Sequence, residues 1–416
     1  MDLGVSDKVA PILAQVSAFI DEEVLPVEPE YWAEVEKDDR WTFTDRQTEI
    51  LETLKAKARD KGLWNFFLTE GEHSSGLSTV EYAYLAEEMG RSHLAPEVFN
   101  CAAPDTGNME VLEKYGTEAQ QEQWLKPLMA GEIRSAYAMT EPAVASSDAT
   151  NISTQAVLDG DEWVINGEKH WISGAGDPRC KIMIVMVKTD LDAPKHKQQS
   201  QILVPMDTPG VEIIRPMQVF GKDDAPHGHM HLRYNNVRVP KENVILGPGR
   251  GFEISQGRLG PGRIHHCMRA LGAAERALKL MCERATTRVA FGKPLARLGG
   301  NIDIVANARM DIEQARLLTL KTAWLMDNVD PKEARIWISM IKTAVPNVTI
   351  RIIDDAIQMF GGLGVSQDTP LAAMYAGQRT LRLADGPDAV HRMVVGRNEF
   401  KKYMELDGVS ATFRDG

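Results

Sequence analysis

The sequence is poor in cysteine, and its cysteines are widely spaced. Four occur among 416 residues, and no two of them form a Cys-x-x-Cys pair. A zinc site or a disulfide framework usually shows such pairs or a dense set of cysteines, so neither is indicated. We therefore expect reduced thiols and no bound metal. The four residues are Cys101, Cys180, Cys267 and Cys282.

Positive charge is also scarce. The chain carries 47 Lys and Arg residues against 59 Asp and Glu residues, which gives a net charge of −12. Proteins that bind nucleic acid usually present a basic face, so nucleic-acid binding is disfavoured.

Long apolar runs and targeting signals are missing as well. No run of about 18 apolar residues predicts a membrane span. The beginning of the sequence has an early acid and no long apolar core, and the last residues, Phe-Arg-Asp-Gly, carry no peroxisomal address. We expect a cytoplasmic protein that is not inserted in a membrane.

What the sequence does contain is typical of a large globular protein. Hydrophobic residues make up 43% of the chain and charged residues 25%, and the length suggests two or three domains. In the first third, apolar residues at helical spacing from Val9 to Ile20 predict a helix that Pro26 closes. Three Ser/Thr-x-x-Gln/Glu patterns predict further helix starts at Thr44, Ser78 and Thr117.

The middle of the chain is predicted to be rich in strands. The Asn166-Gly167 pair inside Trp163–Ile172 predicts a hairpin of two short strands. Closely spaced turn signals favour a barrel or a sandwich. Further strands are expected over 181–188, 201–206, 211–214 and 237–240.

The last third is predicted to be helical again. Long amphipathic stretches with short connections predict a four-helix bundle. They cover 251–287, 302–327, 331–359 and 387–404. The fold class is therefore α+β and multidomain: an N-terminal helical domain (1–133), a central β-barrel or sandwich domain (134–250) and a C-terminal four-helix bundle (251–416).

The stretch Ala136–Asp148 matches neither a helix nor a regular strand throughout. Glu141-Pro142 stops any helix, because the residue before proline avoids the helical region and proline lacks an N–H group. Small residues follow, and the stretch ends in Ser146-Ser147-Asp148. Small residues allow close backbone approach to a ligand, whereas the composition alone is also that of a surface turn.

Five motifs, in this domain order, resemble the acyl-CoA dehydrogenase family. They are Ala138–Pro142 continued through Ser147-Asp148, then Trp171–Ser173, Arg288–Lys293, Gln358–Gly364 and Leu383–Gly386. The runs Gly257–His266 and Ala384–Asp388 are similar to the subgroup that includes the vertebrate family members 10 and 11. The resemblance implies the acyl-CoA dehydrogenase fold and removal of two hydrogens from an acyl-CoA thioester.

The resemblance makes Asp385 the expected catalytic base. It stands where most of the family has glutamate, so the carboxylate is one methylene shorter here. Some branches place the base just before the arginine that matches Arg263, but that position is Gly262 and cannot serve. Burial in an apolar pocket is expected to raise the pKa of the base.

The resemblance also implies FAD as the cofactor, with flavin N5 taking the β-hydride. Serine at 173 keeps the hydroxyl of the threonine that is common in the family near N5, whereas Ala290 and Gly299 depart from the family pattern. Expected contacts of one subunit with FAD come from Tyr137, Met139, Thr140, Trp171, Ser173 and Gly386. Contacts expected from a neighbouring subunit come from Arg288, Phe291, Gln358, Gly361 and Gly362.

Ser147 and Arg263 are the expected substrate contacts, near the thioester and the CoA arm. An extra residue in the preceding loop leaves the choice between Ser146 and Ser147 open. An adjacent histidine pair follows Arg263 in the sequence, and neither member is favoured as a catalyst. Three histidines near residue 229 resemble a metal set, but no metal is expected. The adjacent pair is His265 and His266. The three histidines near residue 229 are His227, His229 and His231.

The implied partners are an acyl-CoA substrate, an electron-transfer flavoprotein as electron acceptor, and other copies of the chain in a homotetramer built as a dimer of dimers. The implied process is fatty-acid metabolism by β-oxidation. Two alternatives stay open: an oxidase of the same fold, similar to nitroalkane or acyl-CoA oxidases, and a flavin-containing binding protein without turnover. Oxygen consumption would identify the first, and duplex-DNA binding would favour the second.

Overall fold

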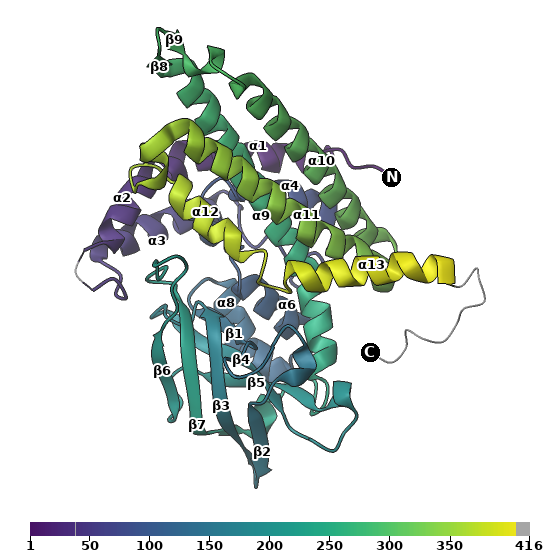
Figure 1. Cartoon of the computed structure of the whole chain (residues 1–416). Helices are drawn as coiled ribbons and strands as arrows, with labels where there is room; N and C mark the ends of the chain where they lie inside the picture. The colour runs from purple at the N-terminus through teal and green to yellow at the C-terminus, as the bar shows by residue number, and fades with distance from the viewer. Residues whose placement is uncertain (38, 405–416) are drawn as a thin grey trace. The chain divides into compact units, whose positions relative to one another are not determined.

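The computed structural model describes residues 1–37 and 39–404 (Figure 1). The chain forms two compact units. The first unit is Ser6–Gly262, and the second unit is Arg263 onward together with Met1–Val5. Helix α9 (Gly251–Thr287) contributes its first residues to one unit and the remainder to the other.

The first unit begins with a longer helical segment than predicted. Helix α1 (Ala10–Phe19) continues through the π-turn η1 (Ile20–Val24) into α2 (Leu25–Val35). The prediction that Pro26 closes the helix is therefore wrong. Pro26 lies in the first turn of α2, where a missing N–H costs little because first-turn donors have no intrahelical partner.

Three further helices of the first unit begin at the predicted capping boxes. Thr44, Ser78 and Thr117 each accept a hydrogen bond from the backbone of the third helical residue, whose side chain bonds back, so all three helix starts are confirmed. They open α3 (Asp45–Asp60), α4 (Thr79–Met89) and α7 (Glu118–Gln120), which continues into the π-turn η2 (Gln121–Leu125). The other helices of this region are α5 (Ala95–Val98), α6 (Asp105–Tyr115) and α8 (Lys126–Met129).

A curled, mixed sheet of seven strands follows the helices. Its order is β1-β4-β2-β3-β7-β6, with β5 paired to β4. Short 3₁₀ turns join it at η3 (Ala149–Asn151), η4 (Lys195–Lys197) and η5 (Lys241–Asn243). The strands are β1 (Arg134–Ala138), β2 (Gln155–Asp159), β3 (Glu162–Ser173), β4 (Cys180–Lys188), β5 (Gln199–Pro205), β6 (Val211–Pro216) and β7 (His229–Pro240).

The predicted hairpin at Asn166-Gly167 is wrong, because β3 runs without a turn from Glu162 to Ser173. Between Ile165 and Gly167 the register against β7 shifts, and the Asn166 side chain accepts a hydrogen bond from the Asn236 amide at 2.8 Å. The pair therefore lies inside one continuous strand, opposite a bulge that adds one residue to β7, and the pairing continues on both sides. The turn that joins β2 to β3 lies earlier, around Gly160 (φ 65°).

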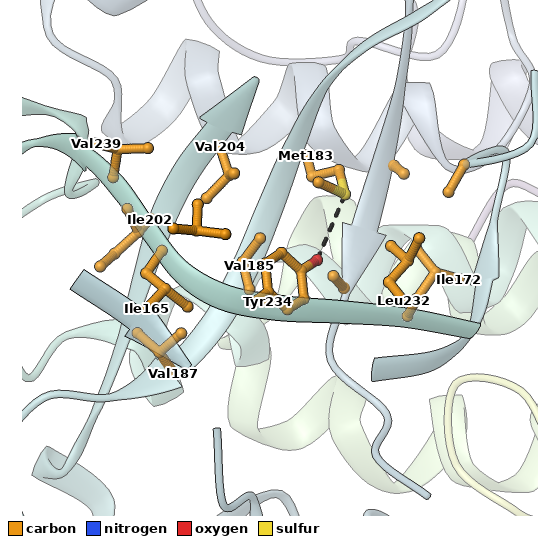
Figure 2. Close-up of a cluster of buried hydrophobic side chains, with 14 of the residues drawn as sticks. Ile165, Ile172, Met183, Val185, Val187, Ile202, Val204, Leu232, Tyr234 and Val239 are labelled. Atoms are coloured by element: carbon orange, nitrogen blue, oxygen red, sulfur yellow. Dashed lines mark hydrogen bonds between the residues drawn. The ribbon is translucent and has the colours of Figure 1, made fainter. Parts of the chain in front are cut away.

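Apolar side chains from one face of the sheet form the core of the β-region (Figure 2). Ile165, Val185 and Leu232 are fully or almost fully buried, and the Tyr234 hydroxyl lies 3.4 Å from the Met183 sulfur. Since strand side chains alternate between faces, this core fixes which residues of β3 and β7 lie on the other face.

The second unit is helical, as predicted. It holds the last part of α9, the small hairpin β8 (Val289–Ala290) and β9 (Lys293–Pro294), η6 (Leu295–Arg297), α10 (Asn301–Asn328), α11 (Pro331–Phe360), η7 (Gly361–Val365), α12 (Leu371–Thr380) and α13 (Asp388–Met404). The predicted long helices agree with α9, α10, α11 and α13 to within one residue at each end. Helix α12 lies before the Asp385 turn and was not predicted.

One described helical segment, Glu333–Val365, is long and apolar enough to cross a membrane. Length and composition alone give this result, and 56% of the apolar window is buried inside the structure. A buried core helix of a globular domain has the same properties.

Candidate functional site

Two segments predicted to contact flavin meet in the first unit. The carbonyl group of Thr140 accepts a hydrogen bond from the His170 amide at 2.9 Å. The carbonyl group of Met139 accepts one from Lys169 Nζ, also at 2.9 Å. The end of β1 and the outer half of β3 are thereby joined, and they present the exposed Thr140 and Trp171 side chains.

A buried ion pair holds this junction. Glu141 and Lys169 are 1% and 0% exposed, and Lys169 Nζ lies 2.8 Å from Glu141 Oε1. The Glu141 carboxylate also accepts hydrogen bonds from Ser153 and Thr154. Burial raises the pKa of Glu141, but Lys169 and these donors outweigh it and bring the pKa to about 2. For Lys169 burial dominates over the attraction of Glu141 and lowers the pKa to about 8.

Trp171 has an unusual backbone and an exposed ring. Its φ is 58°, in the left-handed region that a bulky residue seldom occupies. It sits where the register of β3 shifts between Lys169 and Ile172, and 40% of it is exposed. The irregularity thus turns a large apolar ring outward from the sheet, and the predicted cover of one flavin face by this ring stays a prediction.

Ser173, at the end of β3, starts a chain of hydrogen bonds that the sequence did not reveal. Its Oγ lies 2.8 Å from His229 Nδ1, and His229 Nε2 lies 3.1 Å from Asp224 Oδ2. Ser173 and His229 are direct partners in the register of β3 and β7. No local pattern could indicate this contact, because the two residues are 56 positions apart.

Tyr137 turns its hydroxyl group into the first unit. The hydroxyl lies 2.9 Å from Ser255 Oγ and accepts a hydrogen bond from Gln201 Nε2 at 3.1 Å. The Arg258 guanidinium lies 3.9 Å from the centre of the tyrosine ring. The ring is therefore held in one orientation by α9 and β5, and its predicted contact with flavin stays a prediction.

The two candidate serines play different parts. Ser146 Oγ accepts a hydrogen bond from the Glu141 amide at 2.8 Å and so closes the turn that follows β1. Ser147 is exposed and makes no hydrogen bond to the residues that the structure describes. Of the two, Ser147 is the one whose hydroxyl is available to a ligand.

In the second unit, Asp385 occupies a strained backbone position. Its φ is 55°, and its carbonyl group accepts hydrogen bonds from Arg263 Nε at 3.0 Å and from His391 Nε2 at 3.2 Å. Left-handed backbone is costly for a residue other than glycine and persists where surrounding contacts enforce it. Two side chains from α9 and α13 thus hold Asp385 in place by its backbone.

His391 binds the Asp385 carbonyl group as a neutral ring. Burial, with Arg263 nearby, lowers the pKa of His391 to about 4. Its Nε2 must carry the proton, since a carbonyl oxygen only accepts, and its Nδ1 then accepts from Ser339 Oγ at 3.2 Å.

His266 faces the carboxylate of Asp385. Its Nε2 lies 3.4 Å from Asp385 Oδ2, and its Nδ1 accepts a hydrogen bond from Arg269 at 3.2 Å. Because Nδ1 is the acceptor, a neutral His266 carries its proton on Nε2 and directs it to the carboxylate. His265, by contrast, is 2% exposed, and burial lowers its pKa well below the ordinary value, so it is a core residue.

We expect Gly386→Ala to destabilise this turn. Gly386 has φ 100°, and an added Cβ would lie 2.8 Å from His391 Nε2. The free energy of unfolding, measured with urea, should fall by about 1–3 kcal/mol. The matched control is Gly377→Ala in α12, where an added Cβ meets no atom within 4 Å and alanine should stabilise the helix by about 0.5–1 kcal/mol. Equal stability of the two variants would contradict the clamp on Asp385.

The other predicted cofactor residues of the second unit lie at the far end of α9 from Arg263. They are Arg288, Phe291, Gln358, Gly361 and Gly362. Phe291 is 96% exposed, and Arg284 stacks over Phe360 at 5.2 Å, which brings the two motifs together. From Arg263 to the end of α9 is about 36 Å at the helical rise. Within one chain these residues therefore cannot adjoin Asp385.

In residues 1–37 and 39–404, no group of three or more His, Cys, Asp or Glu side chains is placed to hold a metal ion. Two of the three histidines near residue 229 have other partners: His229 pairs with Ser173 and Asp224, and His231 pairs with Glu168 at 2.9 Å.

Three family models match the chain in succession. "Acyl-CoA dehydrogenase, N-terminal domain" matches residues 6–132, "Acyl-CoA dehydrogenase, middle domain" matches 136–235, and "Acyl-CoA dehydrogenase, C-terminal domain" matches 249–400. The chain belongs to the acyl-CoA dehydrogenase family. The resemblance stated from its motifs is confirmed.

Individual acyl-CoA dehydrogenase relatives are similar over almost the whole chain. "Probable acyl-CoA dehydrogenase FadE2" of Mycobacterium tuberculosis is 53% identical over 407 residues, which is 97% of this chain and 98% of that protein. "Acyl-CoA dehydrogenase family member 10" of Mus musculus is 53% identical over 97% of this chain, but the chain spans only 38% of that longer protein. A solved structure, "Structure of a putative acyl-CoA dehydrogenase from Mycobacterium abscessus", has 52% identity and a TM-score of 0.93, covering 96% of this chain and 100% of that one.

Proposed function

We propose that the protein dehydrogenates an acyl-CoA thioester at the α and β carbons to give the trans-2-enoyl-CoA, with FAD as cofactor and Asp385 as the base. The observation that carries this proposal is the setting of Asp385. Its left-handed backbone is fixed by two hydrogen bonds to its carbonyl group, and its carboxylate lies 3.4 Å from His266 Nε2. A positioned carboxylate is what removal of an α-proton requires.

The first unit supplies a suitable surface for a flavin ring. The outward indole of Trp171, the exposed Thr140 and the Ser173 hydroxyl lie on segments that the buried Glu141–Lys169 pair ties together. An apolar ring beside backbone amide and hydroxyl groups fits a planar, polar-edged cofactor. FAD, when bound, supplies the acceptor for the hydride that leaves the β-carbon. Ser147, exposed beyond the same loop, is proposed to bind the CoA arm.

We also propose that the working protein is a homo-oligomer, in which one chain completes the cofactor site of another. The support is the length of α9, which separates Arg263 from the Arg288 and Phe291 hairpin by about 36 Å. Gly361 and Gly362 are exposed, and a Cβ added at either would meet no atom within 4 Å, so their backbone is open to a ligand. An electron-transfer flavoprotein is the proposed electron acceptor.

Anaerobic mixing of the FAD-loaded protein with acyl-CoA thioesters of different chain lengths tests the function. After mixing, at least one thioester should bleach the visible absorption band of the flavin. If dithionite bleaches the band and no thioester does, the proposed reaction is wrong. Rapid oxygen consumption with substrate would instead identify an oxidase of the same fold.

A further inference from the structure

The hydrogen-bond chain of Ser173, His229 and Asp224 lies wholly within the first unit. Ser173 ends β3 and His229 begins β7, and the two are direct partners in the antiparallel register. Asp224 precedes β7 in a turn closed by the Gly228 amide, which donates to the Asp224 carbonyl group at 2.8 Å. Its neighbour Asp223 is engaged by Arg40 at 2.7 and 2.8 Å, so Asp224 alone serves His229.

The proton positions in this chain follow from the charge of Asp224. Partial burial raises the pKa of its carboxyl group, but the interaction with His229, chiefly the hydrogen bond, outweighs this and keeps the pKa below its ordinary value. An ionised carboxylate only accepts hydrogen bonds, so His229 Nε2 carries a proton. In the neutral ring Nδ1 is then bare, and the Ser173 hydroxyl donates to it.

Solvent exposure of the side chains increases along the hydrogen-bond chain from His229 to Asp224. The His229 side chain is 20% exposed, whereas that of Asp224 is 44% exposed. Two other histidines, His93 and His227, lie near Asp224. Burial lowers the pKa of His227 to about 3, so His227 is neutral and does not take part in proton exchange.

We propose that Ser173, His229 and Asp224 form a proton relay that connects the flavin-facing hydroxyl of Ser173 to solvent. This proposal rests on the proposed function for the placement of Ser173 at the flavin. When Ser173 Oγ takes up a proton from the group seated against it, its own hydroxyl proton passes to His229 Nδ1. The Nε2 proton then passes to Asp224 Oδ2, which releases it to water. One proton crosses, no electron moves, and exchange with water restores the starting tautomer of the ring.

The relay acts when electrons leave the reduced cofactor, because that step also releases a proton. The assay therefore starts from FAD-loaded protein reduced with dithionite, without any acyl-CoA. Mixing with a one-electron acceptor such as ferrocenium, in H₂O and in D₂O, gives the reoxidation rate and its solvent isotope effect. His229→Asn keeps an acceptor for Ser173 but cannot reach Asp224, and Asp224→Asn removes the proton outlet.

The flavin of both variants should reoxidise about 100-fold more slowly than that of the unchanged protein. This value is the lower end of the rate loss expected when a positioned proton-transfer group is removed. Ser173→Thr should restore the rate that Ser173→Ala loses. The matched control is His231→Asn, which removes a histidine–carboxylate pair two residues along β7 that does not contact Ser173, and its rate should not change. Unchanged rates in both His229→Asn and Asp224→Asn would overturn the relay.

A second readout does not need the cofactor at all. ¹⁵N NMR of the apoprotein should show the His229 ring protonated on Nε2, and Asp224→Asn should abolish this preference. A ring protonated on Nδ1 in the unchanged protein would overturn the relay. Failure of every acyl-CoA to bleach the flavin would refute the proposed dehydrogenation, but it would leave both of these measurements valid.

Discussion

Asp385→Asn should abolish bleaching of the flavin by acyl-CoA while leaving FAD bound. The amide cannot take the α-proton, and loss of a general base costs about 10²- to 10⁴-fold in rate. The backbone clamp by Arg263 and His391 uses only the carbonyl group of residue 385, so the turn should keep its shape. Stopped-flow absorbance under anaerobic conditions measures the rate, and the flavin spectrum measures cofactor content.

Two matched variants make this result interpretable. Asp385→Glu restores the residue that is usual in the family and should retain measurable bleaching. Asp368→Asn changes an exposed aspartate of the same unit and should behave like the unchanged protein. Bleaching by Asp385→Asn at the normal rate would refute the assignment of the base.

Lys169→Met should destabilise the first unit strongly. It leaves the Glu141 carboxylate buried without its cation, and breaking a buried pair in this way costs about 3–5 kcal/mol. Urea unfolding followed by a probe in the β-region measures the change in the free energy of unfolding. Combining Lys169→Met with Glu141→Gln removes both charges and should recover part of the loss. The control Arg238→Met breaks exposed pairs with Asp159 and Glu162 and should cost at most about 1 kcal/mol.

The same pair predicts how stability changes with pH. The pKa of Glu141 in the folded state, about 2, lies below the ordinary value of 4.5. The stability contributed by its carboxylate is therefore complete above pH 4.5 and is lost as the pH falls from 4.5 to 2. The pKa of Lys169, about 8, lies below the ordinary 10.5, so its burial opposes folding at neutral pH and this cost disappears between pH 8 and 10.5. A stability profile without the acidic loss, or one unchanged by Lys169→Met, would contradict the assignment.

The long helices of the second unit could be predicted because local sequence determines them. The stretch 251–287, for example, shows continuous helical spacing and ends as predicted at Thr287. The capping boxes at Thr44, Ser78 and Thr117 were equally informative, since each depends on residues only three positions apart.

In both wrong predictions the surrounding structure overrode a local signal. Asn166-Gly167 has the composition of a hairpin turn, but pairing with β7 on both sides keeps β3 continuous. Pro26 signals a helix end, yet the preceding π-turn places it where a helix can begin. Local rules give the tendency of a dipeptide, and the neighbouring strand or helix decides the outcome.

The candidate site also contains residues that the sequence could predict and contacts that it could not. Asp385 and Trp171 could be proposed from motifs, and the structure adds that both have left-handed backbones. Ser173 could be proposed too, but its contact with His229 depends on strand register, and Asp224 depends on a turn in another part of the chain. His266 was not favoured from sequence because adjacent helical residues point in different directions, and only coordinates show which one faces Asp385.

The register of β3 and β7 ties the relay to the folding of the sheet. The pair next to Ser173 and His229 is Ile172 with Met230, and both of these are buried in the core. A shift of one residue in either strand would move the side chains of that strand to the opposite face, which exposes its member of the core pair and buries its member of the polar pair. An insertion or deletion in either strand would therefore cause the sheet to misfold, and would not give a folded protein with altered proton transfer. Point substitutions at Ser173 or His229 are the route by which the relay can change while the sheet stays intact.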